Sequence, residues 1–145
     1  MNYNHAARQY GEVAVHSRVE SASPHRLIQM LLDGALEKVN VARGHLAQGN
    51  IIDKGANISW AISIIDGLRV SLDKEAGEIA ENLDSLYGYV TRRLTEAHAK
   101  NDMHMLDEVV MLLRQIKEAW DAIGETMKEH ANSDASEQGG IVTGA

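Results

Sequence analysis

The sequence predicts an all-α protein: an antiparallel up-down-up-down four-helix bundle with an additional N-terminal helix and a disordered C-terminal tail. The 145 residues include one proline and no phenylalanine, and they are rich in helix-favouring alanine, leucine and glutamate. Four stretches repeat apolar residues in steps of three and four, as helices packed along a bundle do. No stretch keeps the period-two alternation of a strand between turn signals.

The chain is short enough to form a single domain. We expect a helical domain over residues 1–131, with an N-terminal helical segment at 1–20 and the four-helix bundle at 23–131. Residues 132–145 are small, polar and rich in glycine, a composition that favours disorder.

The N-terminal segment is expected to be a weakly held helix. Its apolar face carries Tyr3, Ala7 and Tyr10 but few large aliphatic side chains, so it has little apolar area to bury. The sequence does not decide between a permanently packed helix and one that detaches.

The bundle begins with a helix from Ser23, whose hydroxyl can cap it, and Pro24 suits the first helical position. Gly49 marks its end. Its seam towards the other helices comprises Ile28, Leu32, Ala35, Val39, Ala42 and Leu46. Leu27 and Leu31 lie beside this seam and widen the apolar face, so the helix needs neighbours on more than one side.

The next helix is expected over residues 53–73 and ends before Gly77. Its seam comprises Ile58, Ala61, Ile65, Leu68 and Leu72. Ile62 and Ile64 lie off this seam, together with Trp60, so this helix is also apolar on more than one face.

Two further helices complete the bundle, one over residues 78–100 and one that follows Asp102 and fades near 129–132. The seam of the first comprises Ile79, Leu83, Leu86, Val90, Leu94 and Ala97. The seam of the second comprises Leu106, Val109, Leu113, Ile116, Trp120, Ile123 and Met127. Tyr87 sits beside the first seam, whereas Tyr89 points towards another face.

Charge and composition argue against several function classes. The net charge is −7, from 14 basic and 21 acidic residues, and the scattered basic residues argue against a nucleic-acid partner. The absence of cysteine, signal peptide and apolar run of membrane-spanning length predicts a cytoplasmic protein without membrane insertion. Metal-binding Glu-x-x-His or His-Glu-x-x-His pairs and glycine-rich phosphate loops are missing. We therefore expect no metal, no cofactor and no enzymatic activity.

Surplus apolar surface is the main functional hint, because a bundle needs only one buried stripe per helix. Adaptable methionines such as Met30 suit a groove for an amphipathic partner. Two glycines inside predicted helices, Gly34 and Gly67, indicate either close helix packing or room for a foreign segment. The same surface would also serve a homodimer, or the N-terminal helix packed over it.

An ordered set of segments resembles the flagellin-specific export chaperones of the FliS family. The set comprises Tyr10, SASPHRLIQMLLDGAL at 21–36, LD at 72–73, GEIAENLDSLYGYV at 77–90 and KNDMHMLDEVVMLLRQIKEAW at 100–120. The resemblance implies a cytoplasmic bundle without catalysis that binds the disordered C-terminal segment of flagellin and prevents premature polymerisation. It also implies that the flagellar export gate recognises the loaded chaperone.

The resemblance carries Tyr10 over as a partner contact, and helical spacing adds further candidates. The full set for the flagellin groove and its N-terminal cover is Tyr3, Ala7, Tyr10, Leu27, Met30, Leu31, Ile62, Ile64, Tyr87 and Tyr89. In the cover hypothesis the N-terminal segment occupies part of the groove until flagellin displaces it. The alternative function is a helical-bundle regulator that binds another flagellar export or transcription-control protein, and a metal- or phosphate-handling enzyme is the third reading.

Overall fold

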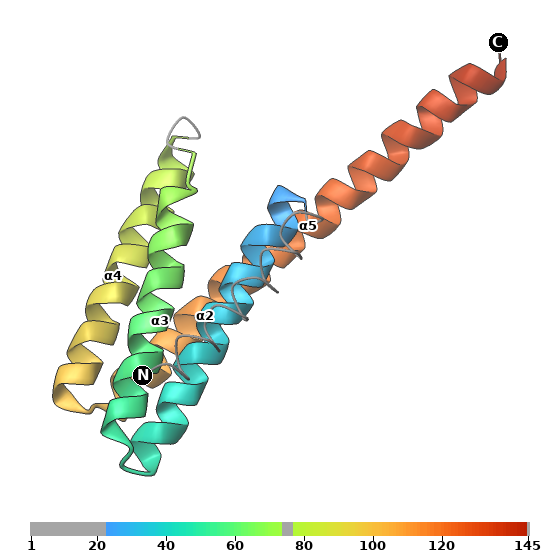
Figure 1. Ribbon diagram of the computed structural model, residues 1–145. Coiled ribbons are helices and arrows are strands. Elements are labelled where there is room, and N and C mark those ends of the chain that lie inside the picture. The colour runs from blue at the N-terminus through green and yellow to red at the C-terminus, as the bar shows by residue number, and fades with distance from the viewer. Residues whose placement is uncertain (1–22, 74–76, 145) are drawn as a thin grey trace, which may run out of the picture.

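The protein is described by a computed structural model that covers residues 23–73 and 77–144, with side-chain positions up to Glu125. Its helices are α2 (Pro24–Ala47), α3 (Ile51–Val70), α4 (Glu78–Lys100) and α5 (Met103–Gly144). The chain descends along α2, returns along α3, descends along α4 and returns along α5 (Figure 1). The predicted up-down-up-down helical bundle is therefore confirmed, while the N-terminal segment at 1–20 lies outside the described residues.

The start and end of α2 follow the predicted signals. The Ser23 hydroxyl accepts a hydrogen bond from the Arg26 backbone N–H at 3.1 Å, and Pro24 occupies the first turn. Gly49 has a φ of 76°, which glycine adopts without a steric penalty, so the chain can turn sharply into α3.

The corner between α4 and α5 uses two polar residues. Asn101 adopts the left-handed conformation with a φ of 51° and ends α4. The Asp102 carboxylate accepts a hydrogen bond from the Met105 backbone N–H at 3.2 Å and so satisfies one of the free N–H groups at the start of α5.

The core is built from the predicted seams. The seam residues that the structure buries are Leu32, Ala35, Val39, Ala42, Ile58, Ala61, Ile65, Leu68, Val90, Leu94, Ala97, Leu106, Val109 and Leu113. They come from all four helices and form one hydrophobic cluster. Hydrophobic burial along these seams is thus what holds the four helices together.

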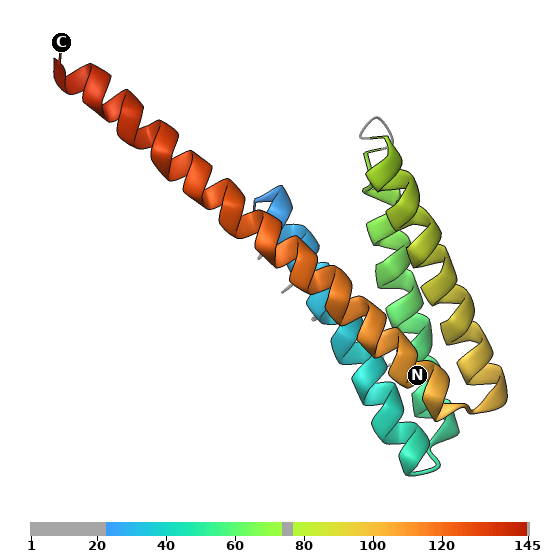
Figure 2. The same ribbon diagram turned by 180° about the vertical axis from the view of Figure 1, so that it is seen from behind.

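The helices are not aligned over their whole length. The α3–α4 pair and the α2–α5 pair diverge towards the end of the molecule that carries the α3–α4 connection (Figures 1 and 2). Ile79 is 73 % exposed and Ile123 is 49 % exposed, so the prediction that both are core residues is wrong. Both belong to seams by spacing, but near this end the opposite helix pair is too far away to cover them.

The C-terminal end of α5 also differs from the expectation. The sequence predicts a disordered tail from residue 132, whereas α5 is helical to Gly144 and extends past the other helices (Figure 1). The physical reason is that a helix nucleated inside the bundle propagates by adding one hydrogen bond per residue, without a further nucleation cost. Among the described residues, no helix combines the length and the apolar character needed to cross a membrane.

Ion pairs cross three of the helix contacts. They are Arg43–Asp107 at 2.9 Å and Lys117–Asp33 at 2.8 Å between α2 and α5, Arg69–Asp84 at 3.0 Å between α3 and α4, and Arg93–Glu108 at 3.1 Å between α4 and α5. These pairs are partly exposed, so each adds little stability. Their main effect is to fix how neighbouring helices face one another.

A buried lysine joins α3 to the α4–α5 corner. Lys54 is fully buried, and its Nζ donates hydrogen bonds to the His98 carbonyl oxygen at 3.0 Å and to the Asn101 side-chain oxygen. Burial lowers the pKa of Lys54, while its position at the negative end of the α4 dipole favours the ammonium form. Lys54 was not predicted from the sequence as a core residue, although it lies four residues before Ile58 and continues the same seam.

Candidate partner-binding face

The outer sides of α2 and α3 meet along a half-buried surface that we call the α2–α3 face. It is formed by Leu27, Met30, Leu31, Gly34 and Lys38 of α2 and by Trp60, Ile64 and Gly67 of α3. On α2, Leu27, Leu31, Gly34 and Lys38 repeat in steps of four, three and four, which makes a second stripe beside the core seam.

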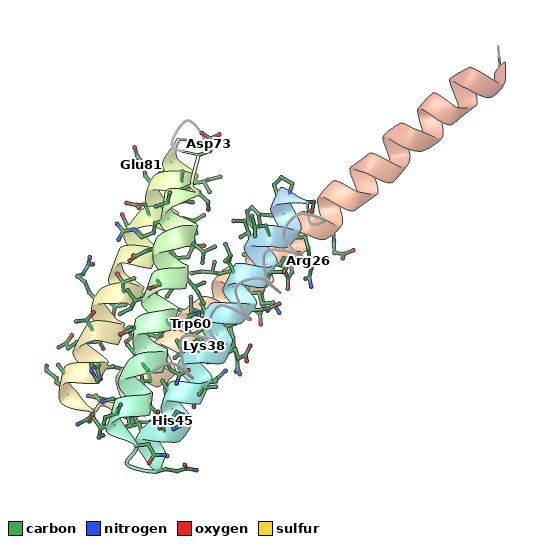
Figure 3. All side chains as sticks on the ribbon, viewed as in Figure 1. Arg26, Lys38, His45, Trp60, Asp73 and Glu81 are labelled. Carbon is green, nitrogen blue, oxygen red and sulfur yellow. The ribbon has the colours of Figure 1, made fainter. Side chains whose placement is uncertain are left out.

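Two contacts show that the stripes of the two helices meet. The Ile64 Cδ1 atom lies 3.6 Å from the position that a Cβ on Gly34 would take. One turn further along, the Lys38 Nζ lies 4.5 Å from the centre of the Trp60 ring, a cation–π arrangement. Figure 3 labels this second pair at the middle of the two helices.

Four of the predicted contact residues share this face. Leu27, Met30, Leu31 and Ile64 are all half-buried, and Leu31 and Ile64 also pack against the core. Sequence reasoning did not select Lys38 or Trp60 as contact residues. Their spacing was the available signal, because each lies four residues from a member of the same stripe.

The two mid-helix glycines of this face have different surroundings. A Cβ on Gly34 would make an ordinary contact with Ile64, whereas a Cβ on Gly67 would meet no atom of the described residues within 4 Å. Close packing between the described helices therefore does not require a glycine at either position. Gly67 leaves open space beside the α3 backbone, whereas Ile64 occupies the space beside Gly34.

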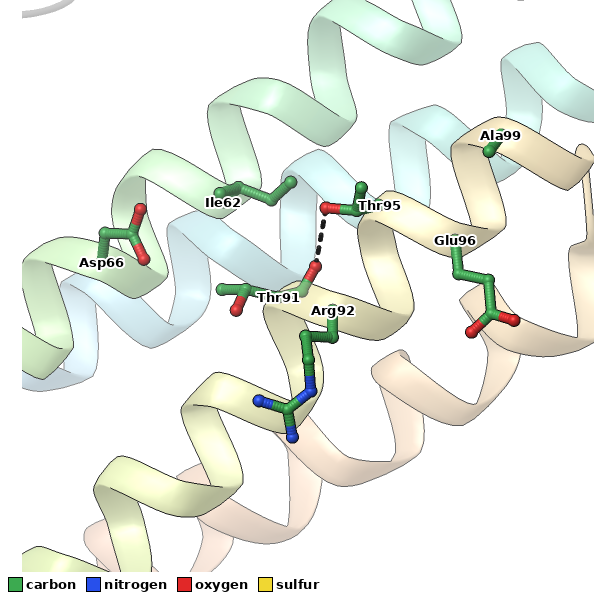
Figure 4. A pocket seen from close by; sticks show the side chains of 7 residues that line it. All are labelled: Ile62, Asp66, Thr91, Arg92, Thr95, Glu96 and Ala99. Atoms are coloured by element: carbon green, nitrogen blue, oxygen red, sulfur yellow. Dashed lines mark hydrogen bonds between the residues drawn. The ribbon is translucent and has the colours of Figure 1, made fainter.

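Three predicted contact residues, Ile62, Tyr87 and Tyr89, lie outside the α2–α3 face. Ile62 lines a separate groove between α3 and α4 (Figure 4). Tyr89 faces α5, where its hydroxyl donates a hydrogen bond to the Glu108 carboxylate at 2.5 Å. Hydrogen bonds from Tyr89 and Arg93 lower the pKa of Glu108, so this carboxylate stays charged. Tyr3, Ala7 and Tyr10 lie outside the described residues.

The third residue, Tyr87, is a core residue. It is only 3 % exposed, and burial raises its pKa to about 12. Its selection as a partner contact fails because Tyr87 lies three residues before Val90 and therefore continues the buried seam of α4.

The burial of Tyr87 predicts a loss of stability in alkali. An unfolded tyrosine loses its proton near pH 10, whereas folded Tyr87 keeps it to about pH 12. The unfolded state is thus favoured as the pH rises through this interval, by about 3 kcal/mol in total. Urea unfolding at a series of pH values should show this fall, and Tyr87→Phe should reduce it. Parallel curves for the two proteins would contradict the prediction.

Within the described ranges, no group of three or more histidine, aspartate or glutamate side chains is placed to hold a metal ion. The α2–α3 face is instead apolar with one cation, which suits contact with another polypeptide.

Comparisons with known proteins place this fold in a family. Residues 6–127 match the family described as "Flagellar protein FliS". The flagellar secretion chaperone FliSB of Pseudomonas aeruginosa is 49 % identical over 119 residues, which cover 81 % of this chain and 94 % of the relative. The flagellar secretion chaperone FliS of Vibrio cholerae is 43 % identical over 131 residues, covering 90 % and 94 %.

Two further comparisons agree. The flagellar secretion chaperone FliS of Salmonella typhimurium is 50 % identical over 118 residues, covering 80 % of this chain and 87 % of the relative. A solved structure described as a flagellar chaperone from bacteria has the same fold, with a TM-score of 0.68 at 12 % identity, covering 83 % of this chain and 98 % of that one. By sequence over most of its length, this chain belongs to the flagellar protein FliS family.

Proposed function

We propose that this protein is a cytoplasmic flagellar secretion chaperone. It binds the disordered C-terminal segment of flagellin, prevents premature filament polymerisation and helps to deliver flagellin to the flagellar export gate. The observation that carries this proposal is the 43 % to 50 % identity with three relatives named flagellar secretion chaperones, over at least 80 % of this chain. A chaperone family is also not an enzyme class, which supports a binding role.

The α2–α3 face supports the proposal physically. A disordered client must lose several kcal/mol of conformational freedom when it folds on binding, and buried apolar area has to offset that cost. Leu27, Leu31 and Ile64 provide half-exposed aliphatic area, and Met30 can adapt to the shape of the client. Gly67, which has open space beside it, lets a client backbone approach closely.

Residues 1–18 act in this proposal as a removable cover for the same face. Tyr3, Ala7 and Tyr10 would supply its apolar side, and its small area would let flagellin displace it. A cover that competes with the client lowers the apparent affinity by the fraction of protein that is covered. Removing residues 1–18 should therefore expose apolar surface to a dye and strengthen client binding.

Calorimetric titration with the C-terminal segment of flagellin tests the function. We expect binding at one-to-one stoichiometry with a negative heat-capacity change, because the client buries apolar surface. Met30→Glu, on the α2–α3 face, should weaken binding by at least about tenfold, since a charge would be desolvated beneath the client. Met111→Glu is the matched control, because Met111 lies on α5 and is 52 % exposed.

Three outcomes would count against parts of this proposal. No binding at flagellin concentrations on the order of tens of micromolar would overturn the flagellin client. Equal weakening by Met30→Glu and Met111→Glu would remove the α2–α3 face as the site. If the protein without residues 1–18 showed unchanged client affinity and no new apolar surface, the cover would be excluded.

A further inference from the structure

Lys38 is the cation of the otherwise apolar α2–α3 face. Its Nζ lies 4.5 Å from the centre of the Trp60 ring, so the two side chains meet between α2 and α3 (Figure 3). Besides this ring contact, the Lys38 amine has no ion pair or hydrogen bond to the part of the chain that the structure describes. An ammonium has three N–H donors, and a contact with a ring face leaves donors available for an anion.

The carboxylates of α2 do not neutralise Lys38. No aspartate or glutamate stands three or four residues from it in the sequence, which are the positions that share its side of the helix. Asp33 belongs to the side of α2 that faces α5, because its carboxylate pairs with the Lys117 amine at 2.8 Å. Glu37 follows Asp33 by one turn and therefore lies on that same side.

The carboxylates of α3 are also remote from this cation. No aspartate or glutamate stands three or four residues from Trp60, and Asp66 lines the separate α3–α4 groove. Asp53 lies seven residues before Trp60, which is about 10 Å along the helix. Salt at physiological concentration screens exposed charges over about this distance. The surface around Lys38 is therefore positive, although the whole chain carries a net charge of −7.

A client that covers the α2–α3 face removes water from the Lys38 ammonium. A desolvated ammonium weakens binding strongly when it has no counter-charge, because a ring contact replaces only part of its hydration. The amine reaches bulk water only if it gives up its contact with Trp60. A client that binds tightly therefore has to bring an anionic group to Lys38.

Apolar surface lies on both sides of Lys38 along α2. Leu31 and Gly34 precede it in the same stripe, and Val41, three residues further on, is 39 % exposed. A client that uses this whole surface passes over Lys38 and does not end there. The anionic group is therefore a side chain within the client segment, and the carboxylate of its last residue is not the source.

We propose that Lys38 fixes the register of the bound client by pairing with an aspartate or glutamate side chain that has apolar client residues on both sides. This inference rests on the proposed flagellin function and adds the residue that selects among client segments. The client carboxylate accepts charge-assisted hydrogen bonds from the ammonium, while the Trp60 ring contacts the other side of the ammonium. A segment with an apolar residue at this register leaves the cation unpaired and binds more weakly.

A double-mutant cycle tests the pairing. Each aspartate and glutamate of the flagellin C-terminal segment is replaced in turn by asparagine or glutamine, and each peptide is titrated calorimetrically into the full chain and into Lys38→Met. One replacement should weaken binding to the unchanged protein by at least about tenfold, because it leaves Lys38 unpaired beneath the client. Lys38→Met should weaken binding of the unchanged segment by a similar factor. Both changes together should cost about tenfold and not about a hundredfold, since they remove the same pair.

Three controls separate the charge from other effects. Lys38→Arg keeps a cation over the Trp60 ring, so it should bind the unchanged segment within about threefold of the unchanged protein. Lys100→Met, on α4 and away from the α2–α3 face, should bind as the unchanged protein does. A segment with an amidated C-terminus should also bind normally, because its last carboxylate is not the paired group. Circular dichroism verifies that each variant is folded.

Three results would overturn this inference. They are additive losses at every acidic position of the client, equal binding by Lys38→Met and the unchanged protein, and a loss on amidation that disappears in Lys38→Met. The last result would place the end of the client chain at Lys38. No binding of the unchanged segment to the unchanged protein would instead overturn the proposed client, so the two failures are distinguishable.

Discussion

Replacing Lys54 with alanine should lower the free energy of unfolding by about 3 kcal/mol. The substitution removes the buried amine that donates to the His98 carbonyl oxygen and to Asn101, and it leaves a cavity where the fully buried side chain was. Each lost hydrogen bond to these part-buried acceptors costs about 1 kcal/mol, and lost aliphatic packing adds to this. Urea unfolding followed by far-ultraviolet circular dichroism measures the change.

Two variants show where this loss comes from. Lys54→Met keeps most of the aliphatic volume but loses both hydrogen bonds, so we expect about 1–2 kcal/mol. Lys100→Met is the surface control. Among the described residues the Lys100 amine pairs only with Glu96 of the same helix, and its side chain is 59 % exposed, so we expect less than about 0.5 kcal/mol. A loss below about 0.5 kcal/mol for Lys54→Ala would contradict the role given to Lys54.

Gly124→Ala should destabilise the junction between α2 and α5 by about 2 kcal/mol. The His25 ring stacks on Trp120 with a centroid separation of 4.7 Å, and the Trp120 indole N–H donates to the His25 carbonyl oxygen at 3.0 Å. A Cβ on Gly124 would collide with the His25 ring. The ring must then leave its stack or α5 must shift, and such overpacking typically costs about 1–3 kcal/mol.

Gly67→Ala provides the matched comparison, because the same change is made inside a helix without a described neighbour. Relief of the glycine penalty should stabilise it by about 0.5–1 kcal/mol. The two variants should therefore shift the thermal midpoint in opposite directions, and the tryptophan fluorescence of Gly124→Ala should report a changed Trp120 environment. If Gly124→Ala were as stable as Gly67→Ala, the His25–Trp120 stack would have rearranged without loss of stability, which would contradict the prediction.

The sequence was sufficient for the fold wherever spacing alone determines which side of a helix is buried. The seam of α2 is an example, since Leu32, Ala35 and Val39 are all buried. The exposure of Ile79 and Ile123 could not be predicted from the sequence, because it depends on how far the two helix pairs diverge. That divergence is set by the packing of many side chains from different helices, which no local period records.

The candidate site was likewise predictable from the sequence only in part. Leu31 and Ile64 were selected because each directly precedes a seam residue. Both pack against the core, and Ile64 also lies beside Gly34 of α2. Tyr87 could not be assigned, because both Leu86 and Tyr87 fit steps of three and four towards Val90.

The order of the helix contacts has a consequence for folding. Each helix packs against the one that follows it in the sequence, and the contact between α2 and α5 closes the ring. Loops between successive helices are short, so little chain entropy is lost before most contacts form. Helical bundles with such local contacts fold in microseconds to milliseconds, whereas a ribosome adds only about 5–20 residues per second. Newly made chains of this protein should therefore be ready to bind almost as soon as synthesis ends.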